Sequence, residues 1–433
     1  MKRDIIHILA DWNVWWEKKE VPPDLVGKER EKTRELTDML GMREIKIVTG
    51  VRRSGKSTLL YQAIDCLLKK GIAPESILLI NFEDAALAHY SPEEIYEAYL
   101  SELNPVHGNF IFIDEAQRKE GWEKWIRKQY DLKHAANFFV SGSSSALLKK
   151  EYSTLLTGRN IALEIFPMSF REFLDFSGVA INSTEIITTE TKSKVLFFLK
   201  KYLEWGGFPE VFFRDEIFKR RLLNQYFEDI IYKDIVDRYG TNPGKTKELA
   251  VYLLTNIANP FSMRNTRNAL GLGLETISEY TSYMVEAYLL YALPVYSPSL
   301  KVQSANPKKI YCIDTGLRNA VSFKFSQDAG RMAENAVFNE LKRRGKEVFY
   351  WKGKDGEVDF IVKEGFAPAE AIQVCWNLEE ERTRKREIKA LHGALEEFDL
   401  NEGIVITEDT EATEDIGGKK VLFMPIWKWL LKA

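Results

Sequence analysis

The chain is poor in cysteine, with 3 in 433 residues. Cys66, Cys312 and Cys375 lie far apart and form no C-x-x-C pair. Disulfide scaffolds and structural zinc sites both need more, or more closely spaced, cysteines, so neither class of protein is expected. The usage is typical of a reducing compartment, and we expect a cytoplasmic protein.

Long apolar runs are also missing. A membrane-spanning helix needs about 20 consecutive apolar residues, and no stretch of the sequence approaches that length. The first twelve residues contain Asp4 and Asp11, where a signal peptide has an unbroken apolar core. We therefore expect no membrane partner.

The chain has no excess of either charge, because its formal net charge is only −3. No global basic field attracts nucleic acid, so any contact with DNA has to be local. Hydrophobic residues make up 45% of the chain and charged residues 29%, which is typical of a soluble globular protein. The length predicts more than one domain.

The most informative stretch is a Gly-rich loop between an apolar run and a helical pattern. Its residues match G-x-x-x-x-G-K-[ST], the phosphate-binding P-loop. The two glycines allow a sharp turn close to a ligand, and backbone N–H groups then converge on phosphate at the start of a helix. Lys56 is predicted to reach the β- and γ-phosphates of ATP, and the Ser57 hydroxyl to hold Mg²⁺. An ordinary glycine-containing turn is the alternative. The predicted nucleotide-binding residues are Gly50, Val51, Arg52, Arg53, Ser54, Gly55, Lys56, Ser57 and Thr58.

Two adjacent acids follow the apolar run 110–113. The run predicts a buried parallel strand, and open α/β sheets bind ligands at the carboxyl ends of their strands. Asp114 is predicted to hold Mg²⁺ together with Ser57. Glu115 is predicted to orient or deprotonate the attacking water.

Two further residues are candidates for sensing or stabilising the nucleotide. Another predicted strand, 137–141, ends in Ser141-Gly142-Ser143-Ser144-Ser145, and Ser143 is our choice as a γ-phosphate sensor; a helix N-cap is the alternative. Arg159 is a candidate charge-stabilising arginine, acting in its own chain or on a neighbouring subunit. A surface arginine is the other interpretation.

The pattern along the chain predicts an α/β protein of five regions. Residues 1–40 are predicted to be a helical segment whose Trp12, Trp15 and Trp16 pack on the next domain. Residues 41–176 alternate strand and helix, which predicts a parallel sheet with helices on both faces. The expected strands are 45–49, 77–82, 109–114, 137–141 and 161–165. Residues 177–246 are expected to be a helical linker region, 247–322 a winged-helix domain, and 323–433 a nuclease-like domain.

The expected winged helix consists of helices at 247–258, 263–270 and 274–290 and a ribbon at 292–297 and 309–313. Its last helix would be repelled by phosphates, because it carries three acids and because no Lys or Arg occurs from 268 to 300. Lys301, Lys308 and Lys309 lie in the expected wing. DNA binding through this wing and a protein-contact role both stay open.

The last hundred residues have the αβββαβ order of PD-(D/E)xK nucleases. That chemistry needs an acid on the second strand and Glu-x-Lys on the third, which together hold Mg²⁺ and activate water. Asp359 and the helix acid Glu334 are present, but Gln373 and Cys375 stand where the Glu and Lys belong. We predict that this nuclease site is inactive.

Taken together, the chain resembles the archaeal and bacterial AAA-type P-loop ATPases that carry a C-terminal restriction-endonuclease-like domain of unknown function. The resemblance is carried by GVRRSGKSTLL at 50–60, FIFIDEAQ at 110–117, VSGSSSALL at 140–148, YLEWGGFPEVF at 202–212 and GEVDF at 356–360. It implies an ATPase fold with sensor-like residues, a winged helix and a nuclease-like tail.

The leading hypothesis is an ATP-binding, Mg²⁺-dependent ATPase that acts as a molecular switch and couples its nucleotide state to movement of the winged-helix and nuclease-like modules. The alternatives are a DNA-binding or DNA-processing protein, with duplex or branched DNA as its partner, and a non-catalytic ATP-binding scaffold. Protein partners and a homo-oligomer remain open, since AAA-type relatives often form rings.

Overall fold

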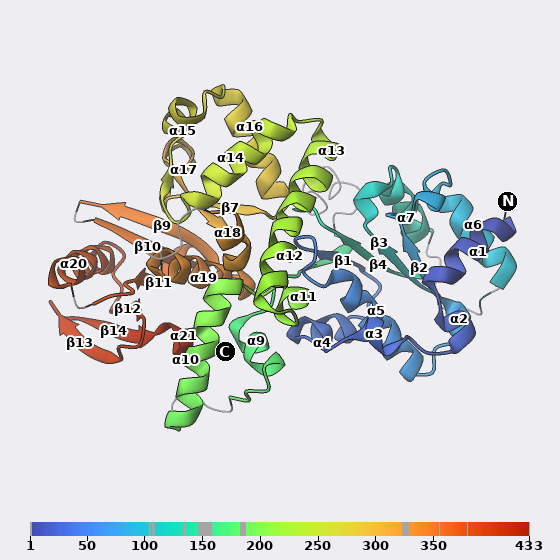
Figure 1. The fold of residues 1–433 in the computed structure, drawn as a ribbon, viewed down its shortest axis with the longest axis horizontal. Helices are drawn as coiled ribbons and strands as arrows, with labels where there is room; N and C mark the ends of the chain where they lie inside the picture. Colours follow the sequence, from blue (N-terminus) through green and yellow to red (C-terminus); the bar gives the residue numbers. More distant parts are fainter. Residues whose placement is uncertain are drawn as a thin grey trace. The chain divides into compact units, whose positions relative to one another are not determined.

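The computed structural model describes residues 2–103, 105, 109–132, 136–145, 158–181, 188–322, 329–354, 356–378 and 380–432. The chain divides into two compact units, Met1–Ile165 and Phe166–Ala433, each with its own sheets and cores (Figure 1). In the described parts of the chain, no helix combines the length and the apolar character that a membrane span requires.

The first unit contains a five-stranded sheet in the order β2-β3-β4-β1-β5. Every neighbouring pair of strands in it is parallel. All five strands lie within one residue of the predicted positions, so the predicted parallel sheet is confirmed. The strands are β1 (Ile45–Thr49), β2 (Ile77–Asn81), β3 (Asn109–Asp114), β4 (Ala136–Gly142) and β5 (Asn160–Glu164).

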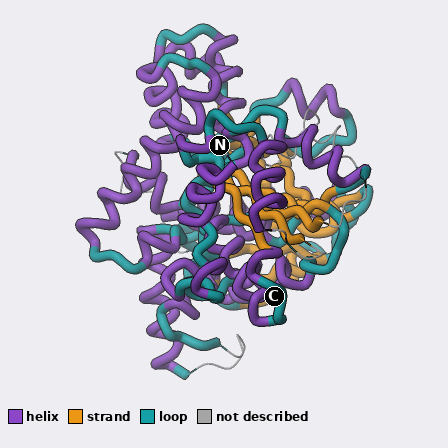
Figure 2. Tube along the Cα trace, turned by 90° about the vertical axis from the view of Figure 1, so that its right-hand side faces the viewer, coloured by secondary structure: helices purple, strands orange, loops and turns teal. Residues whose placement is uncertain are grey.

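Helices cover both faces of this sheet (Figure 2). Successive side chains of a strand point to opposite faces, so Leu78 and Ile80 join one core while Ile77 and Leu79 join the other. The first core is closed by α1 (Lys2–Trp12), α6 (Pro92–Leu103) and α7 (Trp122–Asp131). The second is closed by α2 (Trp15–Lys18), α4 (Glu31–Asp38) and α5 (Lys56–Lys69).

The N-terminal tryptophans anchor the first helices to this unit. The indole N–H groups of Trp15 and Trp16 both donate to the Ile77 carbonyl, at 3.2 and 2.9 Å. That of Trp12 donates to Asp84 at 2.8 Å. The prediction that these tryptophans pack on the following domain is confirmed.

The second unit begins with helices and a small sheet. Antiparallel strands in the order β6-β8-β7 form this sheet. The predicted ribbon strand 292–297 begins two residues earlier and ends four residues earlier, at Leu293, and the last predicted helix ends at Glu286 rather than at 290. The elements are α9 (Phe170–Phe176), α10 (Thr189–Trp205), α11 (Pro209–Phe212), α12 (Glu216–Asp229), a π-helical segment (Ile230–Val236), α13 (Asp237–Tyr239), α14 (Pro243–Thr255), β6 (Pro260–Phe261), α15 (Met263–Leu270), α16 (Leu274–Glu286), β7 (Leu290–Leu293), α17 (Leu300–Ala305), β8 (Lys308–Cys312) and α18 (Thr315–Val321).

A six-stranded mixed sheet in the order β13-β14-β12-β11-β10-β9 completes the second unit. The predicted αβββαβ order is confirmed, and the polar edge strand β13 is an addition that the sequence did not suggest. The elements are α19 (Ala329–Arg343), β9 (Glu347–Gly353), β10 (Gly356–Glu364), β11 (Ala367–Val374), α20 (Glu381–Glu397), β12 (Glu402–Thr407), β13 (Ala412–Ile416), β14 (Lys419–Pro425) and α21 (Ile426–Leu431).

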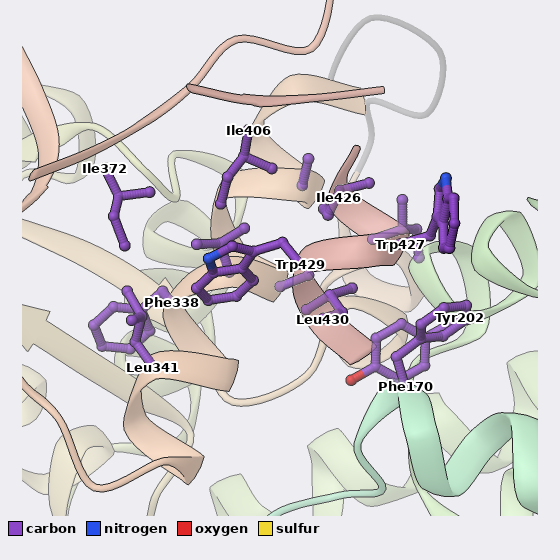
Figure 3. Close-up of a cluster of buried hydrophobic side chains, with 14 of the residues drawn as sticks. Phe170, Tyr202, Phe338, Leu341, Ile372, Ile406, Ile426, Trp427, Trp429 and Leu430 are labelled. Carbon is purple, nitrogen blue, oxygen red and sulfur yellow. The ribbon is translucent and has the colours of Figure 1, made fainter. Parts of the chain in front are cut away.

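One apolar core joins the helices of this unit to the mixed sheet. Figure 3 shows Trp427 and Trp429 of α21 packed among side chains that include Phe338 of α19 and Phe170 of α9. Phe170 falls in the region 41–176 that the sequence assigned to the P-loop domain. Its side chain is fully buried in this core of the second unit.

Candidate functional site

The loop 50–55 connects β1 to α5 at the carboxyl end of the parallel sheet. Three of its residues have positive φ, namely Gly50 at 144°, Arg53 at 68° and Gly55 at 99°. A Cβ on Gly50 would lie 2.1 Å from the carbonyl oxygen of Ile165, so only glycine fits there. Successive N–H groups in such a loop form a concavity for anions.

This loop encloses polar groups that suit an anionic ligand. The Lys56 side chain is buried, and its Nζ donates to the Val51 carbonyl at 3.1 Å. The Ser54 hydroxyl is also buried and has no hydrogen-bond partner among the described residues. A buried ammonium and an unused hydroxyl both favour a ligand rich in acceptor oxygens.

Beside the loop, Asp114 at the end of β3 accepts two hydroxyl hydrogen bonds. Ser57 Oγ donates to its Oδ2 at 2.6 Å, and Ser141 Oγ donates to its Oδ1. Burial raises the pKa of Asp114, and the neighbouring Glu115 charge raises it further. A bound cation would favour the charged form instead.

The donor set around Asp114 fits Mg²⁺ bound together with a phosphate ligand. Mg²⁺ prefers oxygen ligands and is usually held by one or two carboxylates, substrate phosphates and waters. Ser57 and Asp114 supply two adjacent oxygens of this kind. Within the described ranges, no group of three or more His, Cys, Asp or Glu side chains forms an all-protein metal site.

Glu115 has a strained backbone and a carboxylate surrounded by donors. Its φ of 52° is unusual for a residue with a Cβ. Its Oε2 accepts from Gln117 Nε2 at 2.5 Å and lies 4.0 Å from an Arg52 nitrogen. Burial alone would raise the pKa of Glu115, but the Lys56 and Arg52 charges and then the Gln117 hydrogen bond outweigh it and lower the pKa. The lowered pKa favours the ionised form of the carboxylate.

Sequence comparison places residues 42–174 in a family described as AAA domain. The whole chain is 35% identical to the uncharacterized protein MJ1544 of Methanocaldococcus jannaschii, over 94% of this chain and 93% of that protein. The chain belongs to the family of that archaeal protein. An uncharacterized protein of Haemophilus influenzae is 34% identical, over 74% of this chain and 79% of its own length.

Beyond the AAA domain, residues 197–328 and 329–429 match two domains of unknown function, DUF8612 and DUF4143. Among solved structures, the Walker-type ATPase PABY2304 of Pyrococcus abyssi aligns over 68% of this chain and 95% of its own, with 13% identity and a TM-score of 0.44. That similarity is too low to assign a fold. The P-loop fold of this chain follows from its own sheet order and loop, and with the AAA match it makes this a nucleotide-binding domain of the P-loop ATPase class.

The AAA domain brings most of the predicted site residues together. Lys56, Ser57, Asp114 and Glu115 meet where β1 and β3 end. Ser143 follows β4 directly and contacts Glu115, with Oγ 3.4 Å from Oε2. The alternative role of these serines as an N-cap concerns residues 146–148, which lie outside the described residues.

Arg159 is not brought to the P-loop. It lies just before β5, and its carbonyl accepts from the N–H of Ile45, the first residue of β1. Its Nε donates to Asp131 at 3.1 Å. Arg159 therefore lies at the amino end of β1, and the P-loop lies at its carboxyl end. The length of the strand, about 3.3 Å per residue, separates the two. Action on a neighbouring subunit and an ordinary surface arginine both stay open for Arg159.

Sequence reasoning missed three residues that contact the site. Arg30 donates to the Ser54 carbonyl at 2.8 Å. Glu83, which follows β2, pairs with Arg52 at 3.0 Å. Gln117 contacts both Glu115 and Ser143. Glu83 could have been predicted, because it follows strand β2 and parallel strands place their carboxyl ends at the same side of the sheet. No sequence pattern pointed to Arg30.

A second polar cluster lies in the other unit. The Lys309 side chain is only 2% exposed, and its Nζ contacts Glu357 at 2.8 Å, Asp359 at 2.9 Å and Glu334 at 3.2 Å. Tyr311 donates to Glu334 at 2.7 Å. Burial, followed by the Asp359 charge, raises the pKa of Glu334 to about 8. Lys309, which the sequence placed in the expected wing, therefore has its ammonium buried among these acids.

The third-strand positions hold no metal-binding acid and no cation. Gln373 accepts from the Asp359 N–H at 3.2 Å and donates to Glu387 at 2.6 Å. Cys375 is buried, and burial raises the pKa of its thiol to about 11. The cation of this cluster comes instead from Lys309 on β8.

Proposed function

We propose that the chain is an Mg²⁺-dependent ATPase that works as a molecular switch. The observation that carries this proposal is the Ser57–Asp114 hydrogen bond. It joins the P-loop to the acid pair at the carboxyl ends of the strands. The nucleotide would be held by the loop from Gly50 to Thr58, with Lys56 on its phosphates. Ser57 and Asp114 would hold Mg²⁺, and Ser143 would sense the γ-phosphate.

The hydrolysis step needs a base and a stabilised phosphoryl group. The water oxygen forms a bond to the γ-phosphorus, and its proton passes to the Glu115 carboxylate. The bond from the γ-phosphorus to the β,γ-bridging oxygen breaks, and ADP leaves with that electron pair. Lys56 would stabilise the negative charge on the phosphate oxygens, and Mg²⁺ held by Ser57 and Asp114 would supply further positive charge there. The scaffold alternative would show ATP-dependent stabilisation without turnover.

Replacing Glu115 with Gln should lower hydrolysis by about a hundredfold or more, because an amide cannot take the proton of water. Nucleotide affinity should stay within about threefold, since Lys56 and the loop remain. Single-turnover hydrolysis and equilibrium binding of a fluorescent ATP analogue measure the two effects. Glu120→Gln changes an exposed acid five residues on and should match wild type. Equal hydrolysis by both variants would contradict the role of Glu115.

We further propose that residues 247–322 form a winged helix that contacts protein rather than DNA. Its support is α14, α15 and α16 followed by the antiparallel β7 and β8. Tyr283 of α16 stacks on Tyr239 with ring centroids 4.0 Å apart, and Glu286 accepts from the Tyr239 hydroxyl at 2.6 Å. A helix engaged in this way, and acidic, is unsuited to a DNA groove.

The mixed-sheet domain is proposed to be nuclease-like but inactive, because Gln373 and Cys375 supply neither a carboxylate nor a cation. Nucleotide state would then be coupled to movement of these modules. Binding of duplex DNA at low salt, weakening as salt rises, would favour the DNA-binding alternative. The absence of such binding at low salt would dispose of it.

A further inference from the structure

Gln117 lies in a short turn, Ala116–Arg118, directly after the acid pair. Its Nε2 is 2.5 Å from Glu115 Oε2 and 3.0 Å from Ser143 Oγ. A carboxylate can only accept hydrogen bonds, so the amide nitrogen has to face Glu115. Gln117 therefore links the residue predicted to be the base to the residue predicted to be the sensor.

The other end of the same amide is unused. Gln117 Oε1 is buried and has no hydrogen-bond partner among the residues that the structure describes. A buried acceptor without a partner is unfavourable, and native proteins contain few of them. A water molecule has two hydrogens to donate, so one water could pair with both this oxygen and the Glu115 carboxylate.

We propose that Gln117 positions the attacking water. Its amide nitrogen holds the Glu115 carboxylate in place against Ser143, and its amide oxygen accepts a hydrogen bond from the water whose other proton passes to Glu115. This inference rests on the proposed ATPase function. It adds a residue to that site and explains why a polar oxygen is kept unpaired beside the acid pair.

Replacing Gln117 with Met keeps the length of the side chain and removes both hydrogen-bonding ends. The turnover number for ATP should fall by about a hundredfold, because misplaced water and base lose the orientation that speeds the step. KM and the affinity for a non-hydrolysable ATP analogue and for ADP should stay within about threefold. Some loss of stability is expected as well, because the buried Glu115 carboxylate loses the hydrogen bond that Gln117 Nε2 donates to it.

Nucleotide affinity separates this role from a structural one. A glutamine that only supports the fold would lower ADP affinity together with turnover, so a variant whose ADP affinity falls as far as its turnover overturns the proposal. Lys119→Met, whose amine contacts the Ala88 carbonyl outside the acid pair, is the matched control and should keep full turnover.

Coupling to Ser143 is tested by the double variant. If the two residues act as a unit, Gln117→Met with Ser143→Ala should lose about as much turnover as the more impaired single variant. Losses that multiply would contradict the link. The ATPase assignment is tested separately: it stands if wild type turns over ATP and Lys56→Ala does not. If it stands and Gln117→Met still has unimpaired turnover, only the role of Gln117 is overturned.

Discussion

Lys56→Ala should lower ATP hydrolysis by at least about a hundredfold and weaken ATP binding, because it removes the ammonium predicted to contact the phosphates. Losing one preorganised charge contact in a buried site has effects of this size. Lys56 is 4% exposed, and its Nζ is held by the Val51 carbonyl within the loop. The charge therefore lies in the concavity, where solvent screens it little.

Equilibrium binding of a fluorescent ATP analogue and steady-state phosphate release measure the two losses for Lys56→Ala. Lys56→Arg is the informative control, because it keeps the charge but not the compact ammonium. It should retain more binding than the alanine variant. Unchanged turnover by Lys56→Ala would show that the measured activity does not come from this loop.

Lys309→Met should destabilise the second unit by about 3–5 kcal/mol, the range for removing one partner of a buried ion pair. The variant leaves Asp359 and Glu334 buried without their cation, and Glu357 partly buried beside them. Like charges in one site repel, so further protonation of the acids would be expected. The loss is expected where β8 contacts β10 and α19, which carry these acids.

Hydrogen exchange of the backbone amides of β8 and β10 reads this loss locally, in a chain of more than one domain where a single unfolding midpoint is ambiguous. Lys308→Met is the matched control, because Lys308 is the neighbouring and exposed lysine of the same strand. It should leave exchange unchanged. Equal exchange rates for the two variants would mean that the ion cluster contributes little to stability.

The sheet of the first unit could be predicted because its strands are uninterrupted apolar runs between helical patterns. The end of a parallel strand has a fixed place in such a sheet, so Asp114 could be placed beside the P-loop from sequence alone. The edge strand β13 was missed because its residues, Ala412–Ile416, are mostly polar and because it pairs with β14 on one side only. Burial patterns carry little signal at an edge.

Side-chain partners could not be predicted in the same way. Lys308 and Lys309 are adjacent in sequence, yet one is exposed and the other buried, because alternate residues of a strand face opposite sides. Which side is buried depends on α19 and β10, which follow later in the chain. The contact of Gln117 with Ser143 likewise joins two strand ends that only the folded sheet brings together.

The most direct test of the ATPase assignment is single-turnover hydrolysis of ATP by wild type, Glu115→Gln and Lys56→Ala under the same Mg²⁺ concentration. Wild type should convert bound ATP to ADP and phosphate. Glu115→Gln should hold ATP without converting it, and Lys56→Ala should neither hold nor convert it. Equal conversion by all three proteins, or none by wild type, would contradict an ATPase built on Lys56, Asp114 and Glu115.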